Sequence, residues 1–339
     1  MPFDIEPFSP LAGPASGTGG TPARDTVVVG LVNNMPDTAL EATEAQFGRL
    51  LAGAAGSLPV RLRLTSLPQV PRAGAGLERV NSGAYWPIEV LLREPVDALI
   101  VTGAEPCTPR LRDEPYWERL REVLDWADAN TTSSIWSCLA AHAAAEMLDG
   151  IQRRRLEHKR CGIYAHQTLP DQPLLAGLGG SLRTPHSRWN ELPVEALRAA
   201  GYTLASASNE NGADVCTRQG RSLLVFFQGH PEYEDTTLLK EYRRDVGRFL
   251  RGQQAAYPTL PHGYFPHAAL DLLEEFAARA QAAPDPQLLA EFPMAALAAG
   301  LTNSWNEAAL RIYRNWLAML AAAKSITPHS SPKVSESLS

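Results

Sequence analysis

The chain contains few cysteines and no long apolar run. Its 339 residues include only 4 cysteines, at positions 107, 138, 161 and 216, with no Cys-x-x-Cys pair. This pattern favours reduced thiols in a cytoplasmic protein over a disulfide framework, and it suggests no metal site. No uninterrupted apolar stretch reaches the ~20 residues that a membrane helix needs, so we expect no membrane partner.

An excess of positive charge is also missing. Lys and Arg number 31 against 37 Asp and Glu, a net charge of −6, which gives no reason to expect nucleic acid as a partner. The first residues lack the basic and apolar regions of a secretory signal. Residues 1–24 are rich in Pro, Gly and Ala and predict a disordered tail, as do residues 321–339, which leaves 25–320 as a single domain.

Between the tails, apolar runs alternate with helical patterns. The run TVVVGLVN at 26–33 is typical of a buried parallel strand, and the amphipathic segment 39–54 follows it. Further strands are predicted at 60–67, 96–104, 133–138 and within 202–233, and further helices at 116–130, 139–148, 235–252 and 309–324. Strands alternating with helices predict an α/β fold with a mainly parallel sheet and helices on both faces.

Cys138 lies where one of these strands gives way to a helix. Residues 131–136 have the β-branched and aromatic content of a strand end, and Leu139–Leu148 is rich in Ala and Leu and free of Gly and Pro. A sulfur at such a turn lies near the helix N-terminus, which favours the thiolate form of a nucleophile. The alternative is a small buried side chain, because free cysteine is among the most buried residue types.

A second group of reactive side chains follows the last predicted strand. The sequence FFQGHPEY places His230 and Glu232 two residues apart, just after an apolar run ends. Reactive groups of α/β proteins collect at the carboxyl ends of strands, where VTGAEPC, Ser137-Cys138 and PHSRW (185–189) are also expected. A cysteine nucleophile needs a base, and the base needs a partner that orients it. Cys138, His230 and Glu232 supply these three roles, although a histidine alone is more often a loop cap.

Longer motifs give the chain a family resemblance from about Val27 to Trp316. They are NNMPDTALEATEAQFGRLL, LIVTGA, YWERLREVLDWADANTTSSIWSC, HKRCGIYAHQ, PHSRW, GHPEYEDTTLLKEYRRD and YFPH. In these motifs the sequence resembles the homoserine O-acyltransferases, the transsuccinylases and their acetyl-transferring relatives. The resemblance implies a flavodoxin-like sandwich of the class I glutamine amidotransferase type. Simple amidotransferases share the cysteine turn and the His-x-Glu pair but lack the PHSR and EYRRD motifs.

The resemblance also implies roles for individual residues. Cys138 would take the acyl group from acyl-CoA as a thioester, His230 would be the general base, and Glu232 would orient His230. Backbone N–H groups would hold the oxyanion. These N–H groups would belong to Leu139, Gly103 and Ala104.

The substrate-binding residues come from the same resemblance. Lys159 matches a lysine that contacts acyl-CoA, and Arg244 matches an arginine that grips the carboxylate of the amino acid. Arg188 and Glu241 match further acceptor-site positions. Cys107 stands in the loop where relatives carry Gly or Glu according to the acyl group.

The sequence departs from the family at four places around the donor site. Asp37 follows the Met-Pro pair where relatives carry lysine, and Leu139 replaces the tryptophan that usually follows the nucleophile. His142 replaces a glutamine, and Cys107 is neither Gly nor Glu. A succinyl donor needs room and a cation for its carboxylate. Cys107 is small and neutral and so resembles Gly, but Glu105 nearby offers the excluding charge of a glutamate.

The sequence therefore predicts a homoserine O-acyltransferase of methionine biosynthesis, with succinyl-CoA favoured over acetyl-CoA as donor. Acyl-CoA and L-homoserine are the expected partners, acyl-CoA being a substrate and no cofactor being required, and a homodimer is expected. Three alternatives stay open: acylation of another hydroxy amino acid such as L-serine, hydrolysis of an amide, or a non-catalytic amidotransferase-like protein. The three intact catalytic residues oppose the last, and Arg244 with PHSRW opposes glutamine hydrolysis.

Overall fold

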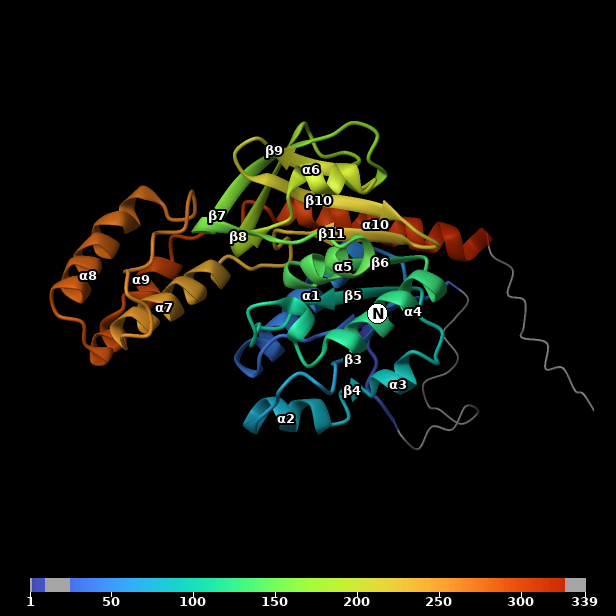
Figure 1. The fold of residues 1–339 in the computed structure, drawn as a ribbon, viewed down its shortest axis with the longest axis horizontal. Coiled ribbons are helices and arrows are strands. Elements are labelled where there is room, and N and C mark those ends of the chain that lie inside the picture. Colours follow the sequence, from blue (N-terminus) through green and yellow to red (C-terminus); the bar gives the residue numbers. More distant parts are fainter. Residues whose placement is uncertain (1, 10–24, 327–339) are drawn as a thin grey trace, which may run out of the picture.

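The computed structural model describes residues 2–9 and 25–326, which form one mixed sheet with helices on both faces (Figure 1). Within these residues the sheet has 11 strands in the order β1-β3-β2-β5-β6-β11-β10-β9-β7-β8, with β4 beside β3. The strands are β1 (Phe3–Ile5), β2 (Val27–Val32), β3 (Val60–Thr65), β4 (Tyr85–Trp86), β5 (Ala98–Thr102), β6 (Ser133–Ser137), β7 (Arg154–Thr168), β8 (Ser181–Glu191), β9 (Thr203–Ser208), β10 (Gly212–Gln219) and β11 (Leu223–Phe227). The helices are α1 (Leu40–Ala55), α2 (Gly74–Asn81), α3 (Ile88–Leu91), α4 (Trp117–Asn130), α5 (Leu139–Asp149), α6 (Val194–Ala199), α7 (Thr237–Leu250), α8 (Leu270–Ala282), α9 (Met294–Ala298) and α10 (Asn306–Ile326).

The parallel part of the sheet has the strand order of a flavodoxin-like fold. β3, β2, β5, β6 and β11 are neighbours in that order and pair in parallel. Numbered along the chain without β1 and β4, these strands run 2-1-3-4-5, the doubly wound order in which ligands bind beyond the carboxyl ends of the strands. Every residue of β2 is buried, as its continuous apolar run predicts. The predicted fold class is confirmed.

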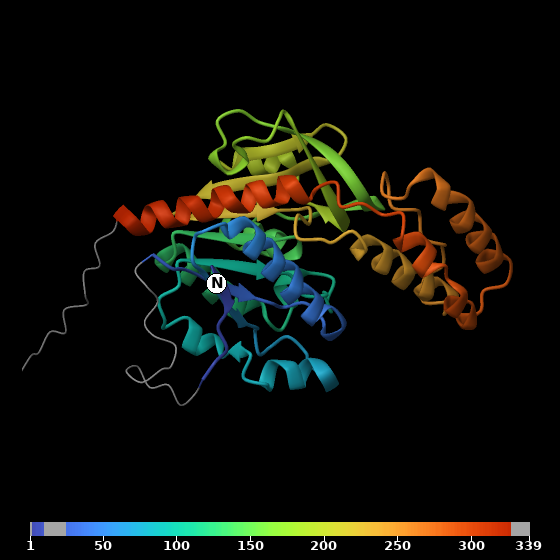
Figure 2. The ribbon, with the colours of Figure 1, turned by 180° about the vertical axis from the view of Figure 1, so that it is seen from behind.

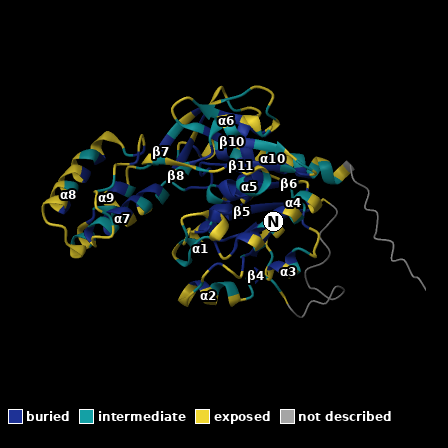
Figure 3. Ribbon diagram, in the orientation of Figure 1, coloured by how far each residue is buried: buried dark blue, intermediate teal, exposed yellow. Residues whose placement is uncertain are grey.

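Helices cover both faces of this sheet and enclose two apolar clusters. One cluster joins α3, α4 and α5 to the sheet, and the other joins α1 and α10 to the opposite face, where Figure 2 shows both helices in front of the strands. Trp316 of α10 is fully buried and donates from Nε1 to Ser133 Oγ at 2.9 Å. Figure 3 shows the central strands as buried and much of α8 as exposed. The core therefore lies along the parallel strands.

An antiparallel extension continues the sheet beyond β11. β10 pairs with β11 and β9, and the long strand β7 pairs with both β9 and β8. The predicted strands and turns of 202–233 are present, with β10 beginning at Gly212 and ending at Gln219. The placement of PHSRW at a strand end was wrong, because residues 185–189 lie inside β8. Many residues of β7 are charged and exposed or half-buried, so the sequence contains no apolar run that would predict this strand.

A third apolar cluster lies beyond one end of the sheet, where α7, α8 and α9 pack together (Figure 1). The predicted closure of the first of these helices at Gly252 is confirmed. Gly252 has a positive φ of 67°, and the N–H groups of Gly252 and Gln253 donate to the carbonyls of Phe249 and Arg248 at 2.9 Å each. This bonding pattern is a Schellman cap, which satisfies the last carbonyls of a helix. The cap ends α7 and turns the chain toward α8.

Both predicted disordered tails are too long. Phe3–Ile5 forms β1 and pairs in parallel with β3, with Phe3 opposite Val60, so residues 2–9 are not a disordered tail. At the other end α10 continues to Ile326, past the predicted domain boundary at 320. Residues 10–24 and 327–339 lie outside the described residues. Among the described helices, none combines the length and hydropathy that crossing a bilayer requires.

Candidate active site

Cys138 forms the turn between β6 and α5, as the sequence predicts. Its φ of 50° and ψ of −109° lie in a region that non-glycine residues seldom adopt, and its N–H donates to the Phe227 carbonyl at 2.7 Å. Such a backbone costs about 1–3 kcal/mol and persists where the surroundings impose it, as at a nucleophile elbow. The strained turn presents the thiol at the carboxyl edge of the sheet.

His230 reaches Cys138 because β11 and β6 are parallel neighbours in register, with Phe227 opposite Ser137. The residues that follow both strands therefore meet at one edge of the sheet. Cys138 and Glu232 are the two neighbours whose charges act most strongly on the His230 ring. Burial lowers the pKa of His230, but the negative charges of Cys138 and Glu232 outweigh burial and raise this pKa well above its ordinary value. The His230 ring therefore favours its protonated, imidazolium form.

Glu232 and Tyr233 fix the ring of His230. Glu232 Oε1 lies 2.8 Å from His230 Nδ1, which assigns the Nδ1 proton to this bond and turns Nε2 toward the thiol. Tyr233 stacks on the imidazole at 4.2 Å between centroids with an interplanar angle of 17°. His230 and Glu232 are both 8% exposed. The half-buried Cys138 and the buried His230 and Glu232 thus lie together, as the sequence predicts for a nucleophile, a base and an orienting acid.

The predicted oxyanion site is a close approach of two backbone segments. The loop after β5 meets the start of α5 so closely that a Cβ on Gly103 would lie 2.5 Å from Leu139 Cβ and 3.2 Å from Ala140 N. Only glycine fits at this distance. The approach brings the 103–104 turn beside the first turn of α5, whose N–H groups have no partner within the helix.

Lys159 and Arg244 share carboxylates near the catalytic residues. Lys159 Nζ donates to Asp245 Oδ2 at 2.6 Å, and Arg244 Nε donates to Asp245 Oδ1 at 3.0 Å. Burial raises the pKa of Asp245, but Lys159 and Arg244 outweigh it and lower this pKa below its ordinary value. The Arg244 side chain stays 47% exposed. One edge of its guanidinium is therefore held while the rest faces solvent, an arrangement that suits an incoming carboxylate.

Glu241 connects these cations to the catalytic histidine. Its Oε1 accepts a hydrogen bond from Tyr233 Oη at 2.6 Å, and its Oε2 accepts one from Ser187 Oγ. Oε2 also lies 3.9 Å from Lys159 Nζ and 3.8 Å from Arg244 Nη2. Both carboxylate oxygens are therefore engaged by protein groups. Glu241 arranges the residues around it, and its oxygens are less available to a substrate.

Arg188 lies close enough to Cys138 for their charges to interact, and three of its five N–H groups are engaged by hydrogen bonds. Nε donates to His186 Nδ1 at 3.2 Å, and Nη1 and Nη2 donate to the carbonyls of Asn190 and Asn211 at 2.9 Å each. The side chain is 2% exposed. Burial and the neighbouring Arg160 lower the pKa of Arg188 to about 10. The guanidinium contributes positive charge near the thiol, and its burial restricts direct contact with a substrate.

Cys107 lies in the exposed loop after β5, with its thiol 3.8 Å from the Glu105 carbonyl oxygen. Within the described residues, the Glu105 carboxylate forms no hydrogen bond with this thiol. It accepts a bond of 3.0 Å from Arg248 Nη2 on α7. This ion pair joins the loop to α7, the helix that carries Arg244. It also neutralises the Glu105 carboxylate, the group that the sequence suggested as excluding a succinyl donor.

Two departures from the family have clear local partners. Asp37, which stands where relatives carry lysine, accepts hydrogen bonds from Arg72 Nη1 at 3.2 Å and from Ala73 N at 2.8 Å. His142 Nε2 lies 3.2 Å from Gln228 Oε1, and burial lowers the pKa of His142 to about 3. His142 is thus a neutral buried side chain, and no hydrogen bond between its ring and Cys138 occurs within the described residues.

Sequence reasoning missed Tyr233, Asp245 and Arg248. Tyr233 directly follows Glu232 in GHPEY, and an aromatic residue adjoining a catalytic pair was a usable signal. Asp245 ends the EYRRD motif and follows Arg244, so a carboxylate beside that cation was visible too. Arg248 gave no signal, because its partner Glu105 is far away in the sequence.

Comparison with known proteins identifies the family of the chain. The family model of homoserine O-succinyltransferase matches residues 23–326. The chain is 48% identical over 300 residues to a homoserine O-succinyltransferase of Rhodopseudomonas palustris, covering 88% of this chain and 90% of that protein. It is 43% identical over 316 residues to one of Bradyrhizobium japonicum, covering 92% and 96%. Among solved structures, a glutamine amido transferase from Methylobacillus flagellatus aligns with a TM-score of 0.49 and 17% identity, over 87% of this chain and 95% of that one. The chain belongs to the homoserine O-succinyltransferase family.

Proposed function

We propose that the protein transfers an acyl group from acyl-CoA to the hydroxyl of L-homoserine through a thioester on Cys138. The observation that carries this proposal is the arrangement of half-buried Cys138 with buried His230 and Glu232 at the carboxyl edge of the sheet, in a chain of this family. The described residues, 2–9 and 25–326, are proposed to act as one acyltransferase domain.

In the first half-reaction the Cys138 thiolate attacks the thioester carbonyl of acyl-CoA. The carbonyl oxygen becomes an oxyanion beside the N–H groups of the 103–104 turn and of Leu139. The bond from carbon to the CoA sulfur then breaks. His230, protonated at Nε2, gives its proton to the departing CoA thiolate. The products are CoA-SH and an acyl thioester on Cys138, with a neutral His230.

In the second half-reaction His230 acts as the base. Its neutral Nε2 takes the hydroxyl proton of homoserine while the oxygen attacks the thioester carbonyl. The bond from carbon to Cys138 Sγ breaks, and the thiolate reforms beside a protonated His230. Arg244, through the exposed edge of its guanidinium, holds the carboxylate of the amino acid and aligns the hydroxyl with the thioester.

The donor is proposed to be succinyl-CoA, with acetyl-CoA as the second candidate. The relatives named above are homoserine O-succinyltransferases. The ion pair between Glu105 and Arg248 favours a succinyl donor, because Arg248 neutralises the Glu105 carboxylate, which would otherwise repel the carboxylate of the succinyl group. The small Cys107 is then the side chain at the discriminating position. L-Serine is the alternative acceptor. A cytoplasmic location, a homodimer and independence from any cofactor are further proposals that rest on the family resemblance.

The test is incubation of the protein with succinyl-CoA or acetyl-CoA, alone and with a panel of hydroxy amino acids. With donor alone, peptide mass spectrometry should find the acyl mass on the peptide that contains Cys138. With L-homoserine added, the label should pass to that amino acid and not to L-serine. A label on Cys107 or Cys161, or no label at all, would contradict the proposal.

A further inference from the structure

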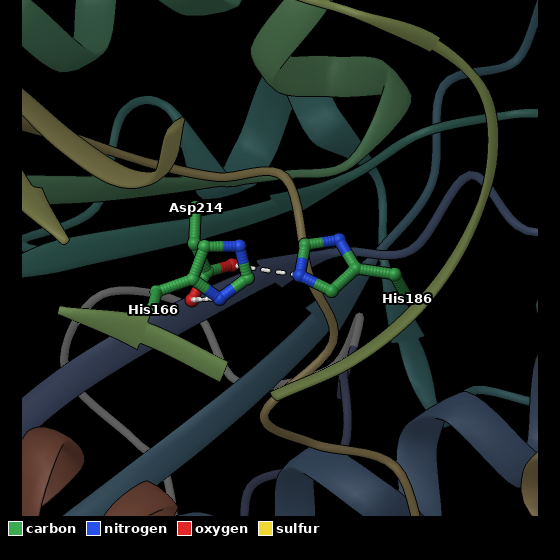
Figure 4. Close-up of side chains that lie close together, drawn as sticks. All are labelled: His166, His186 and Asp214. Atoms are coloured by element: carbon green, nitrogen blue, oxygen red, sulfur yellow. Dashed lines mark ion pairs between the residues drawn. The ribbon is translucent and has the colours of Figure 1, made fainter. Parts of the chain in front are cut away.

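Two imidazoles and a carboxylate lie together in the interior, next to the turn that carries the catalytic base. His166, His186 and Asp214 come from β7, β8 and β10 and are all buried, and their ligand atoms lie within 4.8 Å of one another. Figure 4 shows both rings facing the carboxylate, with His186 Nε2 at 3.4 Å from Oδ1 and His166 Nδ1 at 3.9 Å from Oδ2. An isolated buried carboxylate is costly, so its place here calls for a reason.

The donor set does not suit a metal ion. Arg188 Nε always carries hydrogen, and it donates to His186 Nδ1 at 3.2 Å. The proton of a neutral His186 must therefore be on Nε2, the atom that would have to bind the metal. Burial, followed by the positive charge of Arg188, lowers the pKa of His186 well below its ordinary value, so the ring is neutral. His186 thus presents an N–H group, not a lone pair, to Asp214.

The hydrogen bonds of Asp214 lead instead to the catalytic turn. The N–H groups of three successive residues are held: Gln228 N donates to the Asp214 carbonyl at 2.8 Å, Gly229 N to Asp214 Oδ1 at 3.1 Å, and His230 N to the Pro185 carbonyl at 2.8 Å. Two of these three bonds end on Asp214. The carboxylate is itself held by Thr184 Oγ1, which donates to Oδ2 at 2.9 Å.

Gly229 leaves no space between the turn and this carboxylate. A Cβ on Gly229 would lie 2.6 Å from Asp214 Oδ1, 2.6 Å from Thr184 Cγ2 and 3.0 Å from His186 Nε2. The turn is therefore packed directly against Asp214, and any movement of the carboxylate is passed to the residue that precedes His230.

We propose that Asp214 is a positioning residue, whose carboxylate, held by Thr184 and faced by His186, fixes the Gly229–His230 turn so that the His230 ring meets Cys138. Asp214 acts through the turn and touches no reacting atom. The inference rests on the proposed role of His230 as the base. It assigns to Thr184 of β8 and Asp214 of β10 a task in catalysis.

The test compares Asp214→Val with Asp214→Asn. Asparagine keeps an oxygen that accepts from Gly229 N–H, whereas valine has a similar shape and accepts nothing. We expect kcat per titrated Cys138 to fall by about 100-fold in Asp214→Val, since a 1 Å misplacement costs about that much, with KM for homoserine unchanged. Asp214→Asn should stay within about tenfold of the wild type. Cys216→Ala, in the same strand but without bonds to the turn, is the control and should keep the wild-type kcat.

A second pair decides the question if Asp214→Val does not fold. Thr184→Val removes the nearer of two donors to Oδ2, the other being Ser206 Oγ at 3.5 Å, and should lower kcat by about tenfold; Thr184→Ser should restore it. A readout without turnover is the low-field proton resonance of the bond between His230 Nδ1 and Glu232. This resonance should shift in Asp214→Val and Thr184→Val and should keep its wild-type position in Asp214→Asn. The expectation holds whether or not homoserine is the acceptor.

Three results would overturn the inference. Folded Asp214→Val or Thr184→Val with wild-type kcat and an unmoved resonance would show that the turn does not depend on the carboxylate. A loss in Asp214→Asn equal to that in Asp214→Val would show that charge matters and not hydrogen bonding. Stoichiometric zinc in the wild type, absent from Asp214→Asn, would identify a metal site. Failure of the wild type to form a thioester on Cys138 would instead contradict the proposed function.

Discussion

The parallel and antiparallel parts of the sheet differ in how they use their residues. The parallel strands β2, β5 and β6 are buried along their whole length, and the nucleophile and the oxyanion turn follow directly from their ends. The antiparallel strands β7 and β8 mix exposed charges with buried ones, and they contribute Lys159, Ser187 and Arg188 beside the base. In the proposed mechanism the parallel part thus supplies the groups that form the thioester, and the antiparallel part, with α7, surrounds the acceptor.

The largest effect should come from the nucleophile itself. Cys138→Ser should lower turnover by about 10⁴-fold or more, because serine beside this histidine is not an equivalent nucleophile for the thioester exchange. Both half-reactions should be lost together, as release of CoA without acceptor will show. Thioester formation that survives in Cys138→Ser would place the nucleophile elsewhere.

His230 should rank next, ahead of Glu232. His230→Ala removes the proton carrier from both half-reactions and should lower kcat by about 10³-fold, whereas Glu232→Gln removes only orientation and charge and should lower it by about 10²-fold. Steady-state kinetics with both substrates will measure the two losses.

His142→Ala is the matched control for the base. Because the pKa of His142 is lowered to about 3, this group stays neutral from pH 5 upward, and its loss should leave the shape of the pH–rate profile unchanged. An inactive His142→Ala beside an active His230→Ala would reverse the assignment.

Replacing Arg244 on α7 should affect binding of the acceptor without affecting formation of the thioester. Arg244→Lys should raise KM for homoserine by about tenfold, since losing a bidentate contact costs about 1.4 kcal/mol, while thioester formation stays nearly unchanged. Arg243→Lys, on the same helix and bonded to the Leu289 carbonyl, should change neither step. Slow thioester formation in Arg244→Lys would move this residue to the donor side.

The smallest effect concerns the choice of donor. Cys107→Glu should shift the ratio of kcat/KM for succinyl-CoA over acetyl-CoA toward acetyl by about tenfold, because the new carboxylate repels that of the succinyl group. Cys107→Gln has the same size without the charge and should shift the ratio less. An unchanged ratio in both variants would mean that position 107 does not contact the acyl group.

The sequence predicted the parallel part far better than the antiparallel part. Strands such as Val27–Val32 are buried on both faces, so a continuous apolar run marks them, and the residues after their ends were found with them. Strand β7 has no such run, and its charged residues find partners across the sheet, as Arg154 does in Glu191. The bond from Gly229 to Asp214 could not be predicted, because it depends on how β8 and β10 pack beneath the turn.

The packing of α10 has a consequence for how the protein is made. Trp316 and Leu320 are fully buried against the sheet, and Lys324 bonds to Asp97 and to the Thr26 carbonyl at 2.7 Å each, so the far end of α10 touches the first long strand. A ribosome delivers this helix after every strand of the sheet. During synthesis one apolar face of the sheet thus stays open to water until α10 emerges, and nascent chains expose a surface that aggregates and that chaperones recognise. Chains that stop short of α10 are therefore expected to accumulate as insoluble protein, although they already contain Cys138, His230 and Glu232.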